Sequence, residues 1–83
     1  MAINSEFKLK LENNQLTLAK LRERAGLTQR QLADALGVTN VTISSWERGL
    51  KEPRPNFAQV KIMIQVLGCT LDELVEATNP KYR

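Results

Sequence analysis

The segment from Gly37 to Gly49, GVTNVTISSWERG, carries short polar side chains that can form hydrogen bonds but are poor acids and bases at neutral pH. Asn40 offers a carboxamide, and Ser44 and Ser45 offer hydroxyls, all of which both donate and accept. The sequence contains no histidine, so the commonest general base and metal ligand is absent. We therefore expect a binding protein rather than an enzyme, with no cofactor and no metal site.

The length of the chain limits the size of its fold, and its net charge limits the kind of partner it can bind. The chain has 83 residues, enough for one small core and too few for two domains or for a deep catalytic cleft. Twelve lysines and arginines against nine aspartates and glutamates give a net charge of +3. This mild positive excess suits an anionic partner without requiring one.

The cysteine count and the apolar runs indicate the compartment. Cys69 is the one cysteine, so neither an intramolecular disulfide nor a cysteine-cluster metal site can form, and we expect it to be a small buried side chain. The first ten residues lack the apolar stretch of a signal peptide, and the longest aliphatic run, Ile62 to Ile64, is far too short to span a membrane. We expect a cytoplasmic protein without a membrane partner.

The segment GVTNVTISSWERG mixes strand-forming residues with a helical pattern. If Thr39 is the N-cap of a helix, Ile43 and Trp46 share one face of it, because successive residues turn by about 100°. Short polar residues are poor helix formers, but they let a helix approach the base edges in the major groove of DNA. This composition therefore favours a DNA-reading helix from Asn40 to Arg48, whose outer face carries Val41, Ser44, Ser45 and Arg48.

Four further helices must position this one. Thr28 with Gln31 and Thr70 with Glu73 have the spacing of capping boxes. The predicted helices are one from Thr17 to Gly26, one capped by Thr28 and ended by Gly37, one capped by Asn56 and ended by Gly68, and one opened by Thr70. In the helix after Asn56 we expect a buried face of Phe57, Val60, Ile64 and Leu67, and in the last helix Leu71, Leu74 and Val75 are apolar.

The residues before the first helix alternate between apolar and charged. Phe7 to Leu11, FKLKL, predicts a short amphipathic strand, and Asn13 and Asn14 follow as a turn signal. This strand either lies on the domain as a tail or pairs with the same strand of a second copy. We therefore divide the chain into an N-terminal arm at 1–14, a helical domain at 15–77 and a C-terminal tail at 78–83.

The spacing between the second and third predicted helices is that of a helix-turn-helix. With Gln29 counted as first, Ala33 is fifth, Gly37 ninth, Ile43 fifteenth and Trp46 eighteenth. Ala33 is small where the two helices cross, and Gly37 can adopt the positive φ of the tight turn. Ile43 and Trp46, together with Val38, anchor the third helix in the core.

The stretch LRERAGLTQRQLADALGVTNVTISSWERG, followed by LGCTLDEL, resembles the Cro/C1 or XRE family of bacterial and phage repressors. The pattern LTQ..LA..LGV....IS.WE.G carries the resemblance, which covers roughly Leu16 to Val75. It implies an all-α, five-helix, lambda-repressor-like domain that binds double-stranded DNA, to which this chain adds the short N-terminal strand or arm.

The resemblance also implies roles for individual residues. The positions that read bases correspond to Asn40, Val41, Ser44 and Ser45, of which Asn40 could pair with adenine and Val41 could touch a thymine methyl. Gln29 would donate to a DNA phosphate and brace the third helix, and Arg22 would pair with Glu47 as a structural contact. Further cations near the helix are candidates for phosphate contacts: Arg30, Arg48, Lys51 and Arg54.

We expect a sequence-specific transcriptional regulator, a repressor that binds a pseudo-palindromic operator as a homodimer and is nucleoid-associated when bound to DNA. Two copies are expected because one such domain reads only a few base pairs. The dimer interface is either the fifth helix with its neighbouring loop, as the resemblance suggests, or the Phe7 to Leu11 strand. One alternative is a protein-interaction module, either an antitoxin whose partner is a toxin or an adaptor for another regulator. An enzyme fragment is a third alternative, since some lyases carry this fold.

Overall fold

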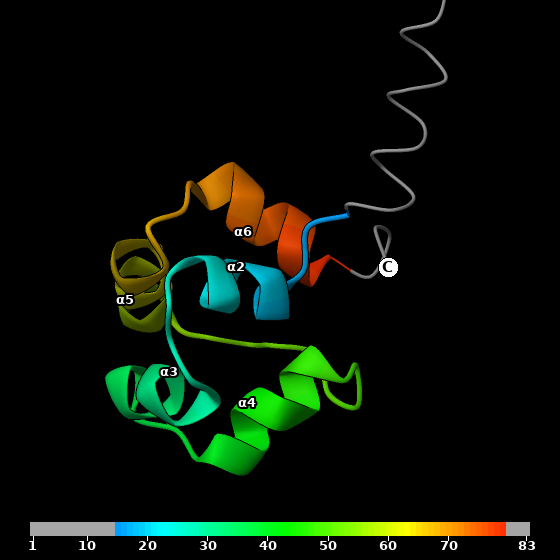
Figure 1. Cartoon of the computed structure of the whole chain (residues 1–83), viewed down its shortest axis with the longest axis vertical. Helices are drawn as coiled ribbons and strands as arrows, with labels where there is room; N and C mark the ends of the chain where they lie inside the picture. Colours follow the sequence, from blue (N-terminus) through cyan, green and yellow to red (C-terminus); the bar gives the residue numbers. More distant parts are fainter. Residues whose placement is uncertain (1–14, 80–83) are drawn as a thin grey trace, which may run out of the picture.

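The computed structural model describes residues 15–79 and shows five α-helices in this range (Figure 1). No strand occurs among these residues, which confirms the all-α fold class. The strand expected at Phe7 to Leu11 lies outside the described residues, as do residues 80–83. The helices are α2 at Leu18–Arg24, α3 at Gln29–Leu36, α4 at Asn40–Glu47, α5 at Phe57–Leu67 and α6 at Leu71–Thr78.

Side chains close by in the sequence cap the starts of the helices. The Thr28 hydroxyl accepts from the Gln31 N–H at 3.0 Å, and the Gln31 carboxamide accepts from the Thr28 N–H at 2.8 Å. Thr70 and Glu73 form the same reciprocal pair at the start of α6, so both predicted capping boxes are present. Each cap stabilises its helix by about 1 kcal/mol. Asn56 and Gln59 form a third box at the start of α5.

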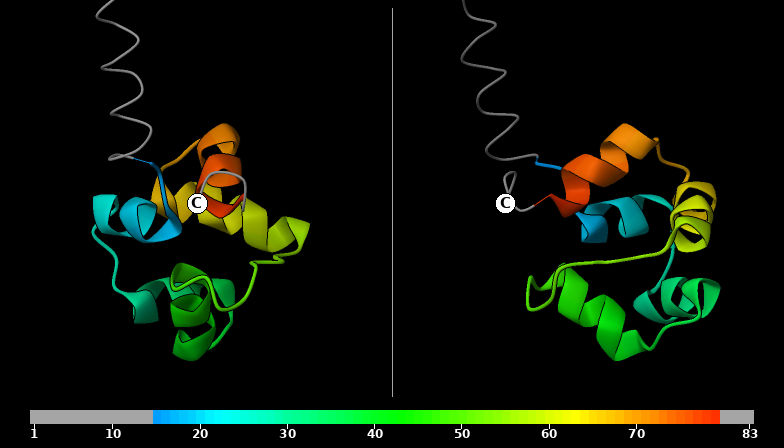
Figure 2. Two further views of the ribbon diagram at one scale, coloured as in Figure 1. Left: turned by 90° about the vertical axis from the view of Figure 1, so that its right-hand side faces the viewer. Right: turned by 180° about the vertical axis from the view of Figure 1, so that it is seen from behind.

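The helices form two levels, with α6 and α2 in the upper part of the domain and α3 and α4 in the lower part (Figure 1). α2 contacts α6, α4 and α5. α3 packs against both α4 and α5, so α5 joins the two levels at one side of the molecule (Figure 1). The segment 48–56 runs from the end of α4 across the molecule to the start of α5 (Figure 2). This arrangement leaves α4 at one end of the domain.

One hydrophobic core holds these helices together, and each helix contributes to it. Leu21, Ile43 and Met63, from α2, α4 and α5, have no exposed surface. Cys69 is buried between α5 and α6, as expected, and its burial raises the pKa of the thiol. The buried residues are Leu18, Leu21, Leu32, Ala33, Leu36, Ile43, Trp46, Met63, Leu67, Cys69, Leu74 and Ala77.

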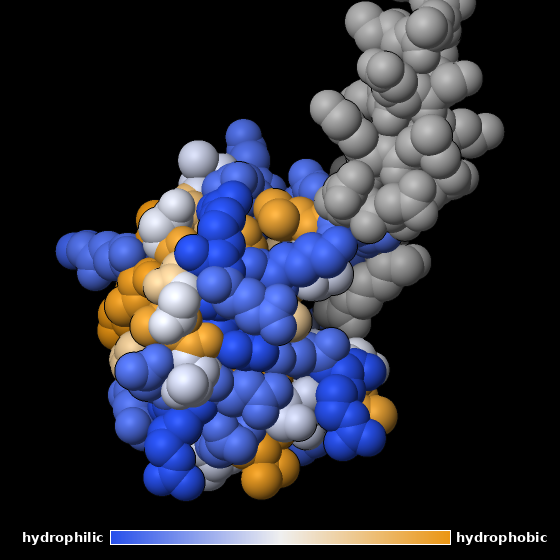
Figure 3. All heavy atoms as spheres, viewed as in Figure 1, coloured by the Kyte–Doolittle hydropathy of each residue, from blue (hydrophilic) through white to orange (hydrophobic). Residues whose placement is uncertain are grey.

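The expected buried face of α5 was wrong at its first residue. Phe57 is 94% exposed, whereas Met63, which was not expected to be buried, has no exposed surface. Phe57 precedes Met63 by six residues and therefore points about 120° away from it around the helix. Leu67, four residues after Met63, shares its face and is buried. Hydrophobic side chains accordingly reach the surface on the side of the molecule that α5 forms (Figure 3).

Candidate nucleic-acid interface

α3 and α4 are joined by a three-residue turn that sets the direction of α4. Gly37 has φ 70° and ψ 30°, a left-handed conformation that suits glycine because it has no Cβ. The Val38 N–H donates to the Ala33 carbonyl at 3.0 Å, which closes the end of α3. Thr39 then caps α4 by accepting from the Thr42 N–H at 3.1 Å. The segment that mixed strand and helix signals is therefore helical from Asn40 to Glu47.

α4 presents two different faces. Ile43 and Trp46 face the core. Asn40 and Val41 lie on the surface, and the Val41 side chain is 72% exposed. Ser44 and Ser45 are half-buried, and Arg48, which ends the helix as its C-cap, is exposed. The exposed face is therefore built from short side chains, and a partner can approach the backbone of α4 closely.

An ion pair fixes the end of α4 to α2. Two guanidinium nitrogens of Arg22 donate to the two carboxylate oxygens of Glu47, at 2.6 and 3.1 Å. Arg22 also donates to the Leu27 carbonyl at 2.8 Å, so it reaches the turn between α2 and α3. The hydrogen bond to Glu47 raises the pKa of Arg22, and this favours the charged form of the guanidinium.

Gln29 adds a third element to this contact. Its Nε2 donates to Glu47 Oε1 at 2.9 Å, so the first residue of α3 holds the last residue of α4. The Gln29 side chain is half-buried and engaged with Glu47, which is the bracing contact that the family resemblance implied. A phosphate contact by Gln29 stays a prediction.

The cations near α4 differ in whether they form an ion pair with a carboxylate of another described residue. Arg30, Arg48 and Lys51 are exposed, and none of them forms an ion pair with another described residue. Arg54 is exposed too, but one of its nitrogens lies 3.8 Å from a Glu52 carboxylate oxygen. An ion pair this exposed contributes little to stability and leaves the guanidinium available to other anions.

Two side-chain contacts between helices have no signal in the sequence. Arg24 donates twice to Glu73, both times at 3.1 Å. Gln59 donates from Nε2 to the Leu36 carbonyl at 3.1 Å. These partners are 49 and 23 residues apart, and helical periodicity carries no information about such pairs.

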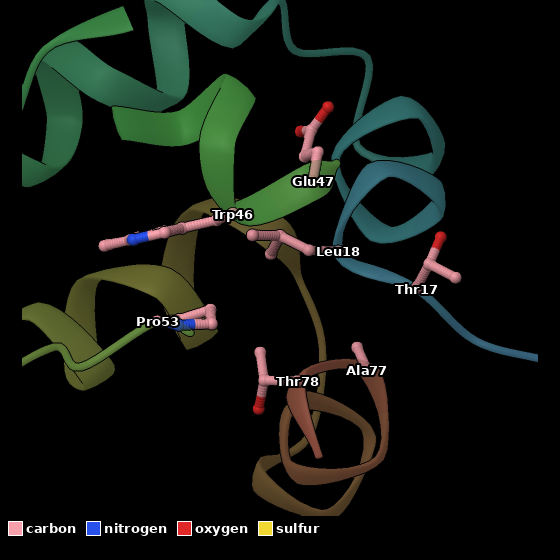
Figure 4. A pocket seen from close by; sticks show the side chains of 7 residues that line it. All are labelled: Thr17, Leu18, Trp46, Glu47, Pro53, Ala77 and Thr78. Carbon is pink, nitrogen blue, oxygen red and sulfur yellow. The ribbon is translucent and has the colours of Figure 1, made fainter. Parts of the chain in front are cut away.

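A small recess lies between the start of α2, the end of α4 and the end of α6 (Figure 4). Its volume of about 40 Å³ has room for one or two water molecules, far below the several hundred Å³ of a typical small-molecule site. The side chain of Glu47 points away from the recess in Figure 4. The residues around it are Thr17, Leu18, Trp46, Glu47, Pro53, Ala77 and Thr78.

Neither a metal site nor a membrane-spanning helix occurs in residues 15–79. No group of three or more histidine, cysteine, aspartate or glutamate side chains within this range could hold a metal ion. None of its helices is long and apolar enough to cross a bilayer.

Comparison with known proteins places this geometry in a family. The helix-turn-helix family model matches residues 18–74. The HTH-type transcriptional activator BcrR of Enterococcus faecalis is 40% identical over 58 residues, which are 70% of this chain and 28% of that protein. The type II methyltransferase M.SsoII of Shigella sonnei is 41% identical over 56 residues, which are 64% of this chain and 14% of the enzyme.

The chain thus spans less than a third of the length of either relative. No solved structure gave a significant match. The family match covers all of α2 to α5 and the first half of α6, and it includes every residue of the turn and of the Arg22, Gln29 and Glu47 contact. The chain belongs to the Cro/C1-type, or XRE, helix-turn-helix family.

Proposed function

We propose that the chain is a sequence-specific regulator of transcription that places α4 in the major groove of double-stranded DNA. The observation that carries this proposal is the contrast between the two sides of α4. Its inner side and its end are firmly held by Ile43, Trp46 and Glu47, while its outer side offers small polar groups near the backbone. A firmly held helix whose outer side chains are short fits the major groove, which is about 12 Å wide.

The exposed face of α4 supplies the base contacts in this proposal. Asn40 can donate to and accept from one adenine, and Val41 can pack on a thymine methyl group. Ser44 and Ser45 can donate or accept, so they do not by themselves select a base. Asn40 and Val41 are exposed enough to meet a partner without any rearrangement.

Contacts to phosphates would provide most of the affinity. Gln29 lies in the first turn of α3, where the N–H groups of Gln29 and Arg30 have no carbonyl partner within the helix and can meet a phosphate. The exposed cations Arg48 and Lys51 follow directly after α4, and Arg30 projects from α3. Arg54 is the fourth cation in this proposal, and it would give up its weak contact with Glu52 to bind a phosphate.

We propose further that two copies bind one pseudo-palindromic operator, with half-sites about ten base pairs apart. Leu71 and Val75, on the outer side of α6, are 55% and 49% exposed and could form a symmetric contact. The alternative interface is the segment from Phe7 to Leu11. Deleting residues 1–12 and measuring the mass in solution would separate these alternatives, because a dimer that persists excludes the strand.

Repression by occlusion of a promoter is the mode of regulation that we propose. Activation is the second candidate, because BcrR, which is similar to 70% of this chain, is named an activator. A protein partner, such as a toxin or another regulator, would bind a surface away from α4. The methyltransferase relative is similar over only 14% of its length, so we propose no catalysis for this chain.

Selection of bound sequences from random DNA, repeated at two salt concentrations, tests the proposal. We expect one enriched motif with two-fold symmetry, and an affinity that falls as salt increases because counterions are released from the phosphates. The slope of that decrease reports the number of phosphates contacted. Recovery of bound DNA in which no sequence motif is enriched would contradict sequence-specific binding.

A further inference from the structure

Gln59 connects two elements that are distant in the sequence. Its Oε1 accepts from the Asn56 N–H at 2.9 Å and so completes the capping box at the start of α5. Its Nε2 donates to the Leu36 carbonyl at 3.1 Å, in the last turn of α3. One half-buried carboxamide therefore satisfies backbone groups at the start of one helix and at the end of another.

The Leu36 carbonyl is one of the groups that a helix leaves unpaired at its end. The backbone N–H groups of the turn do not reach it, since Gly37 and Val38 donate to carbonyls earlier in α3. Without Gln59 this carbonyl would lose its hydrogen bond in a part-buried place, which is unfavourable. The side chain therefore holds the last residue before the turn that leads to α4.

We propose that Gln59 is a positioning residue for the DNA-reading helix. By tying α5 to Leu36, it limits the movement of the turn at 37–39 and thereby the direction in which α4 leaves the core. The Arg22 and Gln29 contacts fix the far end of α4 through Glu47, whereas Gln59 acts at its near end. This inference rests on the proposed function, because it concerns how α4 is presented to DNA.

The substitution Gln59→Glu separates the two hydrogen bonds. A glutamate can still accept from the Asn56 N–H, and its negative charge suits the start of a helix, so α5 stays capped. It cannot donate to the Leu36 carbonyl at neutral pH. The matched control is Gln65→Glu, which adds the same charge to the same helix at an exposed position with no side-chain hydrogen bond among the described residues.

Amide hydrogen exchange of the free protein is the first measurement. In Gln59→Glu we expect the Gly37 and Val38 amides to exchange roughly three- to tenfold faster than in the wild type, the change that loss of one hydrogen bond allows. The Leu74 amide in α6 should be unchanged in Gln59→Glu, and the Gly37 and Val38 amides should be unchanged in Gln65→Glu. Equal acceleration in every helix, or no change at the turn, would overturn the inference. In the wild type, the Gln59 side-chain amide should exchange more slowly than that of Gln65, a comparison that needs no variant.

Binding to DNA is the second measurement. We expect Gln59→Glu to lower the ratio of affinities for the selected operator and for a scrambled sequence by roughly three- to tenfold. The added charge alone weakens binding to both sequences, as Gln65→Glu will show, and does not change the ratio. An unchanged ratio in Gln59→Glu contradicts the positioning role. A wild type without sequence preference contradicts instead the proposed function, and the exchange experiment still decides whether Gln59 holds the turn.

Discussion

Arg22 and Glu47, which are 25 residues apart, form a nearly buried ion pair in which Nε and Nη2 of the arginine donate to the two carboxylate oxygens. Their side chains are only 13% and 6% exposed. Gln29 donates to the same carboxylate, so the end of α4 is tied to both α2 and α3. The helix proposed to meet DNA is thus held by a polar contact as well as by the core.

Removal of the Glu47 carboxylate should destabilise the domain strongly. Glu47→Ala leaves Arg22 and Gln29 without their acceptor in a nearly buried place, and we expect the free energy of unfolding to fall by about 3 kcal/mol. Urea denaturation measures this change. Glu23→Ala is the control, because the Glu23 side chain is 67% exposed and lies 3.9 Å from Arg22, and it should cost less than about 0.5 kcal/mol. Equal costs for the two variants would contradict the bracing role.

Base reading and phosphate binding should respond differently to substitution. Asn40→Ala should weaken binding to the selected operator by about 1–3 kcal/mol and relax the preference at one base position. Lys51→Ala, at an exposed position outside the contact of Arg22, Gln29 and Glu47, should weaken binding to operator and scrambled DNA more evenly. Asn40 is exposed, so its substitution should change the free energy of unfolding by less than about 0.5 kcal/mol, and a loss of affinity would not reflect unfolding. Unaltered operator affinity in Asn40→Ala would argue against its assignment to a base.

Local features of this fold could be predicted from the sequence, and contacts that depend on packing could not. The capping boxes at Thr28 and Thr70 join residues three apart, so their spacing identified them. The positions of Ile43 and Trp46 in the core followed from the helix-turn-helix spacing, and the pairing of Arg22 with Glu47 was implied by the family resemblance.

The remaining contacts depend on how the helices pack. The hydrogen bond from Gln59 to Leu36 exists only because α5 begins beside the end of α3, and no periodic pattern encodes that neighbourhood. Phe57 was misplaced for a related reason: α5 is apolar on most of its sides, so the pattern alone did not show which side faces the core. The roles of the DNA-facing side chains stay predictions, because they depend on a partner.

The corrected orientation of α5 has a measurable consequence. Met63→Ala should lower the free energy of unfolding by about 2–5 kcal/mol, because it leaves a cavity at a position with no exposed surface. Phe57→Ala should change it by less than about 0.5 kcal/mol, although it removes a larger side chain, since Phe57 is 94% exposed. Chemical denaturation of both variants under identical conditions is the test. A larger cost for Phe57→Ala would show that the sequence-based orientation was right after all.

The contact between Arg24 and Glu73 should make stability depend on pH. Hydrogen bonds from Arg24, and then from the Thr70 backbone, lower the pKa of Glu73 below its ordinary value. A carboxylate with a lowered pKa in the folded state adds stability above its ordinary pKa, and this contribution disappears as the pH falls through the lowered value. The wild type should therefore be more stable than Glu73→Gln near neutral pH, and the difference should close in acid. The pair is solvent-exposed, so the difference will be small.

Thermal unfolding of wild type and Glu73→Gln across this pH range measures the difference, and Arg24→Gln supplies the control. The glutamine introduced by Glu73→Gln can still accept from the Thr70 N–H, so the capping box survives and the comparison isolates the charge. Because Arg24 is the largest cause of the lowered pKa, the effect of Glu73→Gln on stability should shrink in the Arg24→Gln background. If Glu73→Gln changes stability equally with and without Arg24, the pH dependence arises from the position of Glu73 at the start of α6. It then does not arise from the contact with Arg24 that links α2 and α6.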